Sequence, residues 1–190
     1  MSRSLDPAAT ALSLLLRQPL KGAYALHFFD YRHILTDGRA AIDTMAAYEK
    51  RVGKPLPLRP DGLTIRQGER RIILYNEAIE NRGRLCWTIA HELGHVYLNH
   101  TGESPREQRE ADRFAAALLL PEAVIRFLDC QGDRPLTPEE MTTYFAASLT
   151  ACRRRRWELD AKAEYVPTEE GVELVRRLFA VTQAPAPSAI

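Results

Sequence analysis

Hydrophobic residues recur along most of the chain at the spacing of a helix that buries one face. Asp6 and Pro7 are typical of a helix start, and the leucines that follow lie on one face until Pro19 ends the segment. The same reasoning predicts helices over 37–52, 84–100, 105–120, 122–128 and 137–161. We therefore expect a mainly helical protein.

One segment, 62–75, has the pattern of strands instead. Its β-branched and large apolar residues form two short runs on either side of Gly68. Two such runs joined by a short turn that contains glycine predict an antiparallel hairpin. The resulting fold class is α+β, in which a helical body carries a small antiparallel sheet of two or three strands.

The composition is that of a globular protein, because 45% of the 190 residues are hydrophobic and 27% are charged. Lys and Arg number 26 and Asp and Glu 25, a balance that argues against a surface devoted to nucleic acid or to an anionic membrane. No stretch reaches the ~20 apolar residues of a membrane span, and the apolar run 12–16 is too short for a signal peptide. Cys86, Cys130 and Cys152 form no CxxC pair, which fits reduced thiols. These features predict a cytoplasmic protein.

The candidate chemistry lies in the run His91-Glu92-Leu93-Gly94-His95, within the predicted helix 84–100. Residues i and i+4 of a helix lie one turn apart on the same side, so both imidazoles can bind one metal ion. Zinc accepts imidazole nitrogen and, in catalytic sites, takes three protein ligands and leaves a position open for water. Glu92 is next to a ligand, where its carboxylate can reach such a water and act as the general base.

The alternative is a structural helix that carries two satisfied histidines and a surface glutamate. Chance alone gives an HExxH sequence in roughly 0.01 of chains of this composition. The helix is also apolar on several sides, where an unpaired Glu92 charge would be costly. Both points favour the metal site.

A third ligand has to come from elsewhere, and the next predicted helix, 105–120, offers several carboxylates. Glu110 opens an i, i+4, i+7 series at the edge of the face that packs inward, which makes it the candidate. Glu107 lies one turn earlier and only about 60° away around the helix, so it competes for the same role. Asp112 is about 200° from Glu110, so these two carboxylates cannot both reach one ion.

Several pieces of sequence occur together in a distinctive order and spacing. They are Ile73-Leu74-Tyr75-Asn76, Thr88 to His95, Leu98-Asn99-His100, and Glu110 to Ala116 followed by Leu120-Pro121. Over residues 70–125 they resemble the ImmA/IrrE family of metallo-endopeptidases, a far more specific match than HExxH alone. The resemblance implies a zinc site of His91, His95 and Glu110 with Glu92 catalytic, in an intracellular enzyme that acts on helix-turn-helix repressors.

The chain departs from this resemblance in two respects, one in its C-terminal part and one at its N-terminus. The segment 138–159 is similar to the helical C-terminal part of the family, but four consecutive arginines, 153–156, are a departure. The chain also lacks the separate N-terminal helix-turn-helix domain of some relatives, so we do not expect autonomous DNA binding. Arginines on all sides of a helix are usually solvated or ion-paired, and the alternative is a contact with an acidic partner or nucleic acid.

We predict a single zinc metallopeptidase domain over 1–179, with its core at 62–125 and a helical part at 137–179, and a disordered tail at 180–190. Its function would be zinc-dependent intracellular cleavage of a helix-turn-helix transcriptional repressor, which relieves repression. The rival hypothesis is a metal-containing regulatory protein that binds a repressor without cutting it. Glu92 separates the two, because only the enzyme requires it.

Overall fold

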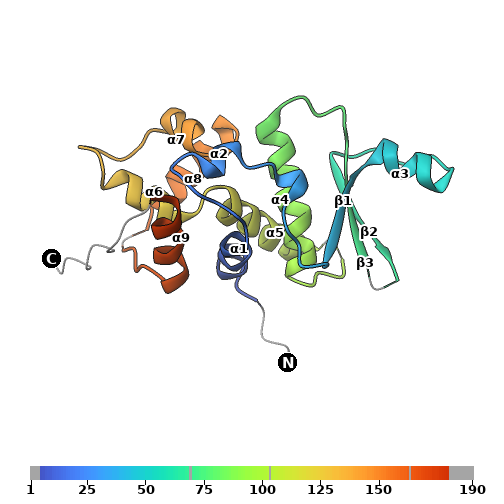
Figure 1. Cartoon of the computed structure of the whole chain (residues 1–190), viewed down its shortest axis with the longest axis horizontal. Coiled ribbons are helices and arrows are strands. Elements are labelled where there is room, and N and C mark those ends of the chain that lie inside the picture. Colours follow the sequence, from blue (N-terminus) through green and yellow to red (C-terminus); the bar gives the residue numbers. More distant parts are fainter. Residues whose placement is uncertain (1–4, 69, 103, 163, 180–190) are drawn as a thin grey trace.

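The computed structural model describes residues 5–68, 70–102, 104–162 and 164–179. Most of these residues are helical, and a three-stranded sheet lies at one end of the molecule (Figure 1). The elements are α1 (Pro7–Leu16), α2 (Ala25–Phe28), the 3-10 helix η1 (Tyr31–His33), β1 (Ala40–Thr44), α3 (Met45–Val52), β2 (Gly62–Gln67), β3 (Arg70–Tyr75), α4 (Arg82–Tyr97), α5 (Pro105–Leu119), α6 (Glu122–Asp129), α7 (Pro138–Tyr144), α8 (Leu149–Asp160) and α9 (Glu169–Phe179). The predicted α+β class is therefore confirmed. The tail 180–190, for which the sequence predicts disorder, lies outside the described residues.

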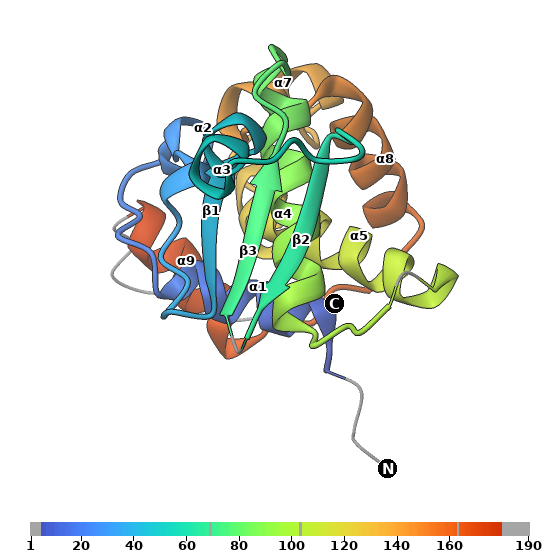
Figure 2. The ribbon, with the colours of Figure 1, turned by 90° about the vertical axis from the view of Figure 1, so that its right-hand side faces the viewer.

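The sheet combines the predicted hairpin with a strand from earlier in the chain. β2 and β3 pair antiparallel, with Thr64 opposite Ile73, and β1 adds in parallel to the other side of β3. The strand order β1-β3-β2 leaves β2 as an edge strand. Ile73 packs into the main core with α4, whereas Ile72 and Leu74 pack against Met45 of α3 on the opposite face. Figure 2 shows the three strands side by side in front of α4.

The single helix predicted over 37–52 is wrong for its first part. Ala40–Thr44 forms β1 instead, and its Ile42 lies opposite Ile73 of β3. Thr44 then caps α3, because its hydroxyl oxygen accepts a hydrogen bond from the Ala47 amide. The local pattern allows either element, and pairing with β3 decides between them.

The long helix predicted over 137–161 is two helices, α7 and α8, with an extended connection between them. Phe145 has extended backbone angles, φ −128° and ψ 142°, and Ser148 caps α8 by accepting a hydrogen bond from the Ala151 amide. This connection crosses α4 at Gly83, where a Cβ atom would lie 2.6 Å from the Ser148 nitrogen. The glycine therefore permits a close approach of two backbones that no other residue would allow.

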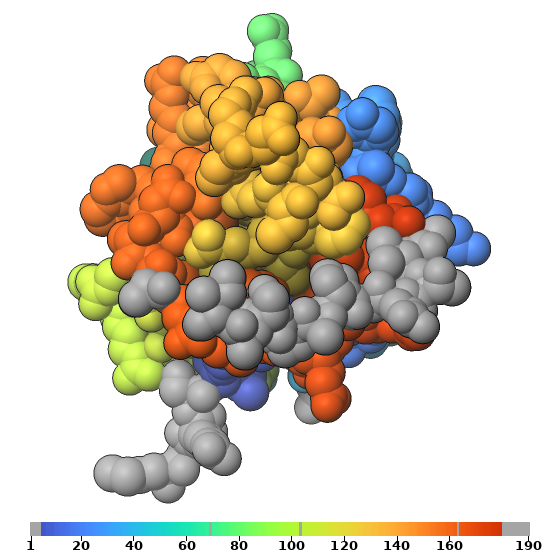
Figure 3. All heavy atoms as spheres, turned by 90° about the vertical axis from the view of Figure 1, so that its left-hand side faces the viewer, coloured from blue at the N-terminus to red at the C-terminus, as the bar shows by residue number. Residues whose placement is uncertain are grey.

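α4 is the central helix of the fold. It packs against β2 and β3 on one side and against α5 on another, and most of its apolar residues are buried, as its sequence predicts. Asn81 caps its start by accepting a hydrogen bond from the Arg84 amide. Ser104 caps α5 in a reciprocal arrangement with Glu107, a capping box, and Pro105 occupies the first helical position. The helices α6 to α9 form the end of the molecule that lies away from the sheet (Figure 3).

The described structure contains no disulfide, in line with the reduced thiols that the sequence predicts. All three are free; Cys86 and Cys152 are buried, and Cys130 is exposed. Burial raises the pKa of the Cys86 and Cys152 thiols to about 11, which keeps them protonated and unreactive at neutral pH. In the described ranges, none of the helices has the length and apolar character needed to cross a bilayer.

Candidate active site

α4 brings the two histidines of the motif together. His91 and His95 lie one helical turn apart, and their Nε2 atoms are only 3.1 Å from each other. Both rings are shielded from solvent to a large degree, since His95 is 9% exposed and the His91 side chain 19%. Two ring nitrogens at this separation can share either a proton or a metal ion.

The close approach of α5 to these histidines depends on Gly94. A Cβ atom at Gly94 would lie 2.9 Å from Cα of Ala111 and 3.1 Å from its carbonyl oxygen, so only glycine fits. The contact places the face of α5 that carries Gln108 and Asp112 directly against His91. Gly94 therefore has a packing role within the motif.

His91 is held by two side chains of α5. Its Nδ1 lies 3.0 Å from Oδ1 of Asp112, and its Nε2 lies 3.0 Å from Oε1 of Gln108. Asp112 is in turn 3.8 Å from a guanidinium nitrogen of Arg154 on α8. Both partners are acceptor oxygens, so each ring nitrogen of His91 donates a proton. Asp112 holds the Nδ1 proton, and a metal ion at Nε2 would take the place of the proton that Gln108 accepts.

His95 is held by a second chain of hydrogen bonds. Its Nδ1 lies 3.1 Å from Nδ1 of His100, and Nε2 of His100 lies 3.2 Å from Oε2 of Glu110. Arg106 donates to the other oxygen of Glu110 at 2.9 Å. One assignment of protons satisfies the whole chain, with His100 donating to Glu110 and His95 donating to His100. Nε2 of His95 then carries a lone pair, directed at Nε2 of His91.

The pKa values of the two histidines are displaced in opposite directions. For His91, burial favours the neutral ring, but the hydrogen bond and the charge of Asp112 outweigh it, so its pKa is raised. Burial lowers the pKa of His95 to about 4, and the neighbouring His91 and His100 add to the effect. At neutral pH, the His95 ring is therefore uncharged, which is the form that binds a metal ion.

Glu92 faces the edge strand β2, whereas the two histidines face α5 and His100. Thr64 of β2 donates a hydrogen bond to Oε2 of Glu92 at 2.6 Å. Gly62 lies two residues earlier on the same face of β2, where a Cβ atom would be 2.5 Å from Cγ2 of Thr88 and 3.2 Å from Cγ of Glu92. β2 therefore packs against the part of α4 that carries Thr88 and Glu92. Figure 2 shows β2 in front of α4.

The structure separates the two glutamates that compete for the third ligand position. Glu107 accepts hydrogen bonds from the Thr101, Gly102 and Ser104 amides, so it is committed to the loop and the start of α5. Glu110 contacts His100 and Arg106 and reaches His95 only through His100. To bind the ion, Glu110 would have to leave both partners, so its ligand role stays a prediction. The oxygen that meets Nε2 of His91 belongs to Gln108.

The donor set fits a metal ion in part. Two imidazole ligands of a tetrahedral zinc ion lie about 3.3 Å apart, given Zn–N bonds of about 2.0 to 2.1 Å, and the observed 3.1 Å needs little adjustment. Both rings are also fixed through Nδ1, as in metal sites that use Nε2. Within the described part of the chain, no group of three or more His, Cys, Asp or Glu side chains is already arranged to hold a metal. The two histidines therefore fit, and a third donor has to move in or be a neutral oxygen.

Sequence reasoning missed the roles of Gln108 and Thr64. A neutral amide is a rare zinc ligand, and Thr64 comes from a distant strand, so neither had a signal in the motif. Asp112 was set apart from Glu110 by about 200° around α5. The structure agrees, because Asp112 meets His91 whereas Glu110 meets His100.

Each arginine of the run 153–156 forms an ion pair within the protein. Arg153 pairs with Glu139 of α7, Arg154 with Asp112 and Glu158, Arg155 with Glu158, and Arg156 with Asp129 and Asp160. Arg155 also donates to the Leu120 carbonyl at 3.0 Å. These contacts support the ion-paired interpretation of the run.

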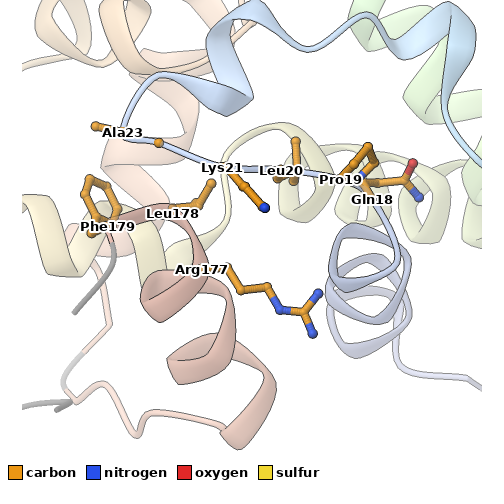
Figure 4. A pocket seen from close by; sticks show the side chains of 9 residues that line it. Gln18, Pro19, Leu20, Lys21, Ala23, Arg177, Leu178 and Phe179 are labelled. Atoms are coloured by element: carbon orange, nitrogen blue, oxygen red, sulfur yellow. The ribbon is translucent and has the colours of Figure 1, made fainter. Parts of the chain in front are cut away.

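A cavity of about 750 Å³ lies away from these residues. It is bounded by the connection between α1 and α2 and by the end of α9, with Lys21 and Arg177 beside apolar walls (Figure 4). None of its lining residues belongs to α4 or α5. The cavity is therefore separate from the candidate active site.

Comparison with known families agrees with the geometry. The sequence model of peptidase family M78, described as the IrrE N-terminal-like domain, matches residues 50–156, which is more than half of the chain. The matched range contains β2, α4 and α5, the three elements that build the site. No curated protein matches the chain. The chain therefore belongs to the ImmA/IrrE-type family of metallopeptidases, with an IrrE N-terminal-like domain.

Proposed function

We propose that the protein is a zinc-dependent endopeptidase of the cytoplasm, which cleaves a helix-turn-helix transcriptional repressor and so relieves repression. The observation that carries the hydrolytic part is the 3.1 Å separation between the Nε2 atoms of His91 and His95, with Glu92 on the same helix. Membership of a metallopeptidase family supports it. The repressor comes from the resemblance to the ImmA/IrrE family.

His91, His95 and, as a third ligand, Glu110 would hold the metal. When bound there, zinc supplies a Lewis acid that polarises the scissile carbonyl and makes a water molecule more acidic. Glu92 then accepts the proton of the attacking water and passes it to the leaving amine. The hydrogen bond from Thr64 orients the Glu92 carboxylate and still leaves it able to accept a proton, because a carboxylate has several acceptor sites.

The edge strand β2 offers a way to hold the substrate. Its outer side has no neighbouring strand in the described sheet, and Thr64 on its inner face donates a hydrogen bond to Glu92. An extended peptide that pairs with β2 gains main-chain hydrogen bonds and passes over the motif. A backbone ladder recognises no sequence, so selectivity requires contacts beyond it.

α8 is the candidate surface for docking a folded repressor. Trp157 on this helix is 73% exposed, and Arg153 and Arg154 lie one turn before it. Arg154 also contacts Asp112, which places this surface beside the site. A large exposed aromatic residue suits a partner that presents apolar side chains. Arg153 and Arg154 would exchange their present carboxylate partners for acidic side chains of the repressor.

The rival function is repressor binding without cleavage, and two measurements separate the hypotheses. First, elemental analysis of protein reconstituted with zinc should give about one zinc per chain, and the His91→Ala, His95→Ala double variant should lose it. His33→Ala is the matched control, since the His33 side chain is 81% exposed. Zinc retained by the double variant would rule out the site.

The second measurement uses a reporter gene under the repressor encoded beside this protein. Wild type should relieve repression, whereas Glu92→Gln should not, because the metal and the docking surface remain but the proton acceptor is lost. Full relief by Glu92→Gln would support the binder and rule out the enzyme.

A further inference from the structure

Three arginines meet at the end of the sheet where β2 ends and β3 begins. Arg39, Arg66 and Arg71 line a pocket of about 300 Å³ together with Gly38, Val96 and Asn99. Among the described residues, no acidic side chain lines this pocket, and no carboxylate forms an ion pair with any of the three arginines. This arrangement contrasts with the arginine run of α8, whose members all have acidic partners.

The register of the hairpin places two of these positive charges next to each other. Arg66 and Arg71 are directly opposite each other in the antiparallel pair β2–β3. Side chains of such a pair lie on the same face of a sheet, and like charges placed there destabilise the pair. A bound anion would remove that repulsion.

The guanidinium groups keep most of their donors for a ligand. Arg71 donates to the His100 carbonyl at 3.1 Å, and Arg66 donates to the Gly68 carbonyl at 3.1 Å. Arg39 lies over the ring of Tyr97, 5.1 Å from its centroid. Each guanidinium has five N–H donors, so these contacts leave others for the oxygens of a carboxylate or phosphate.

The pocket is in register with the candidate active site. Thr64, which contacts Glu92, and Arg66 are two residues apart on β2, so their side chains lie on the same face. In a peptide paired with β2, the residue opposite Thr64 faces Glu92. The residue opposite Arg66 lies two positions away and faces the pocket, whichever direction the peptide runs.

We infer that Arg39, Arg66 and Arg71 form a pocket for an acidic side chain of the substrate, two residues from the side chain that faces Glu92. The inference rests on the proposed function, because it assumes a polypeptide along β2. It assigns the substrate a chemical feature: an Asp or Glu at a fixed distance from the bond that is cut.

The pocket itself is tested without proteolysis, by thermal unfolding with inorganic phosphate as the probe at constant ionic strength. Wild type should show a saturable rise in Tm, and Arg39→Gln and Arg66→Gln should not. Arg70→Gln is the matched control, because Arg70 is next to Arg71 on β3 but its side chain alternates to the opposite face. If wild type shows no saturable rise, or the control loses it too, the pocket is not an anion site.

The substrate assignment is tested by fluorescence anisotropy with Glu92→Gln protein, which should bind without cutting. Two labelled peptides rich in Val and Thr are compared, one with a central Glu and one with Gln. The Glu peptide should bind about tenfold more tightly, as expected for a hydrogen-bonded charge, and Arg66→Gln should abolish the difference. Equal binding, or no binding of either peptide, would overturn the assignment. A failure of the proposed protease activity would leave both binding results intact, so the two failures are distinguishable.

Discussion

Oδ1 of Asp112 lies 3.0 Å from Nδ1 of His91, and this contact joins α5 to the motif on α4. Asp112→Asn keeps the shape of the side chain but removes the charge that makes His91 a stronger donor to the metal. We expect zinc affinity to fall about 10- to 100-fold, as for other outer carboxylates of metal sites. Competition with a chromophoric chelator measures this.

Glu158→Gln is the control for that experiment. Glu158 contacts Arg154, as Asp112 does, but it does not contact His91. An equal loss of affinity in both variants would show that Arg154, and not the bond to His91, matters for the site.

Three variants compare the candidates for the third ligand of the metal. If Glu110 binds the ion, Glu110→Gln should weaken zinc binding far more than Glu107→Gln, because only a ligand loses a charged oxygen from the metal. Gln108→Ala should then have a smaller effect. A larger loss with Gln108→Ala would transfer the role to the oxygen that already lies 3.0 Å from Nε2 of His91.

Parts of this site follow from sequence because they depend on local spacing. The position of His91 and His95 on one side of α4 results from helix geometry, and Ser104 starts α5 through a local cap. β1 was missed because Ala40–Thr44 becomes a strand only by pairing with β3. The contact between Thr64 and Glu92 joins residues 28 apart in sequence, so no periodic pattern reveals it.

Glu107 should stabilise the fold in a pH-dependent way. Hydrogen bonds from the Ser104 side chain and backbone, with further amides of the loop, lower the pKa of Glu107 from 4.5 to about 2. A group with a depressed pKa in the folded state adds stability above its unfolded pKa, and this is lost as the pH falls through the folded pKa. Wild type should thus exceed Glu107→Gln in unfolding free energy at pH 7, and the gap should narrow below about pH 4.5. Urea unfolding at several pH values measures the gap, and a constant difference would contradict the assignment.

Arg156 forms a buried ion pair, unlike the exposed Arg153 and Arg154 of the same run. Its guanidinium lies 2.7 Å from Asp129, and the two side chains are 9% and 10% exposed. Arg156→Met leaves the Asp129 charge buried without this partner and should cost about 3 to 5 kcal/mol of stability. Arg153→Met, in the same run but 63% exposed, should cost about 0 to 1 kcal/mol. Chemical denaturation compares them, and similar small losses would mean that the run does not stabilise the fold.

The chemistry proposed for Glu92 is tested by a cleavage assay with purified components. The zinc-loaded protein is mixed with the repressor encoded beside it, and intact-mass spectrometry follows the repressor over time. Wild type should cut at one discrete bond, and Glu92→Gln should bind the same amount of zinc and repressor without cutting. If Glu92→Gln cleaves at the wild-type rate, or if zinc-loaded wild type leaves the repressor intact, the protein is not the repressor-cleaving enzyme described above.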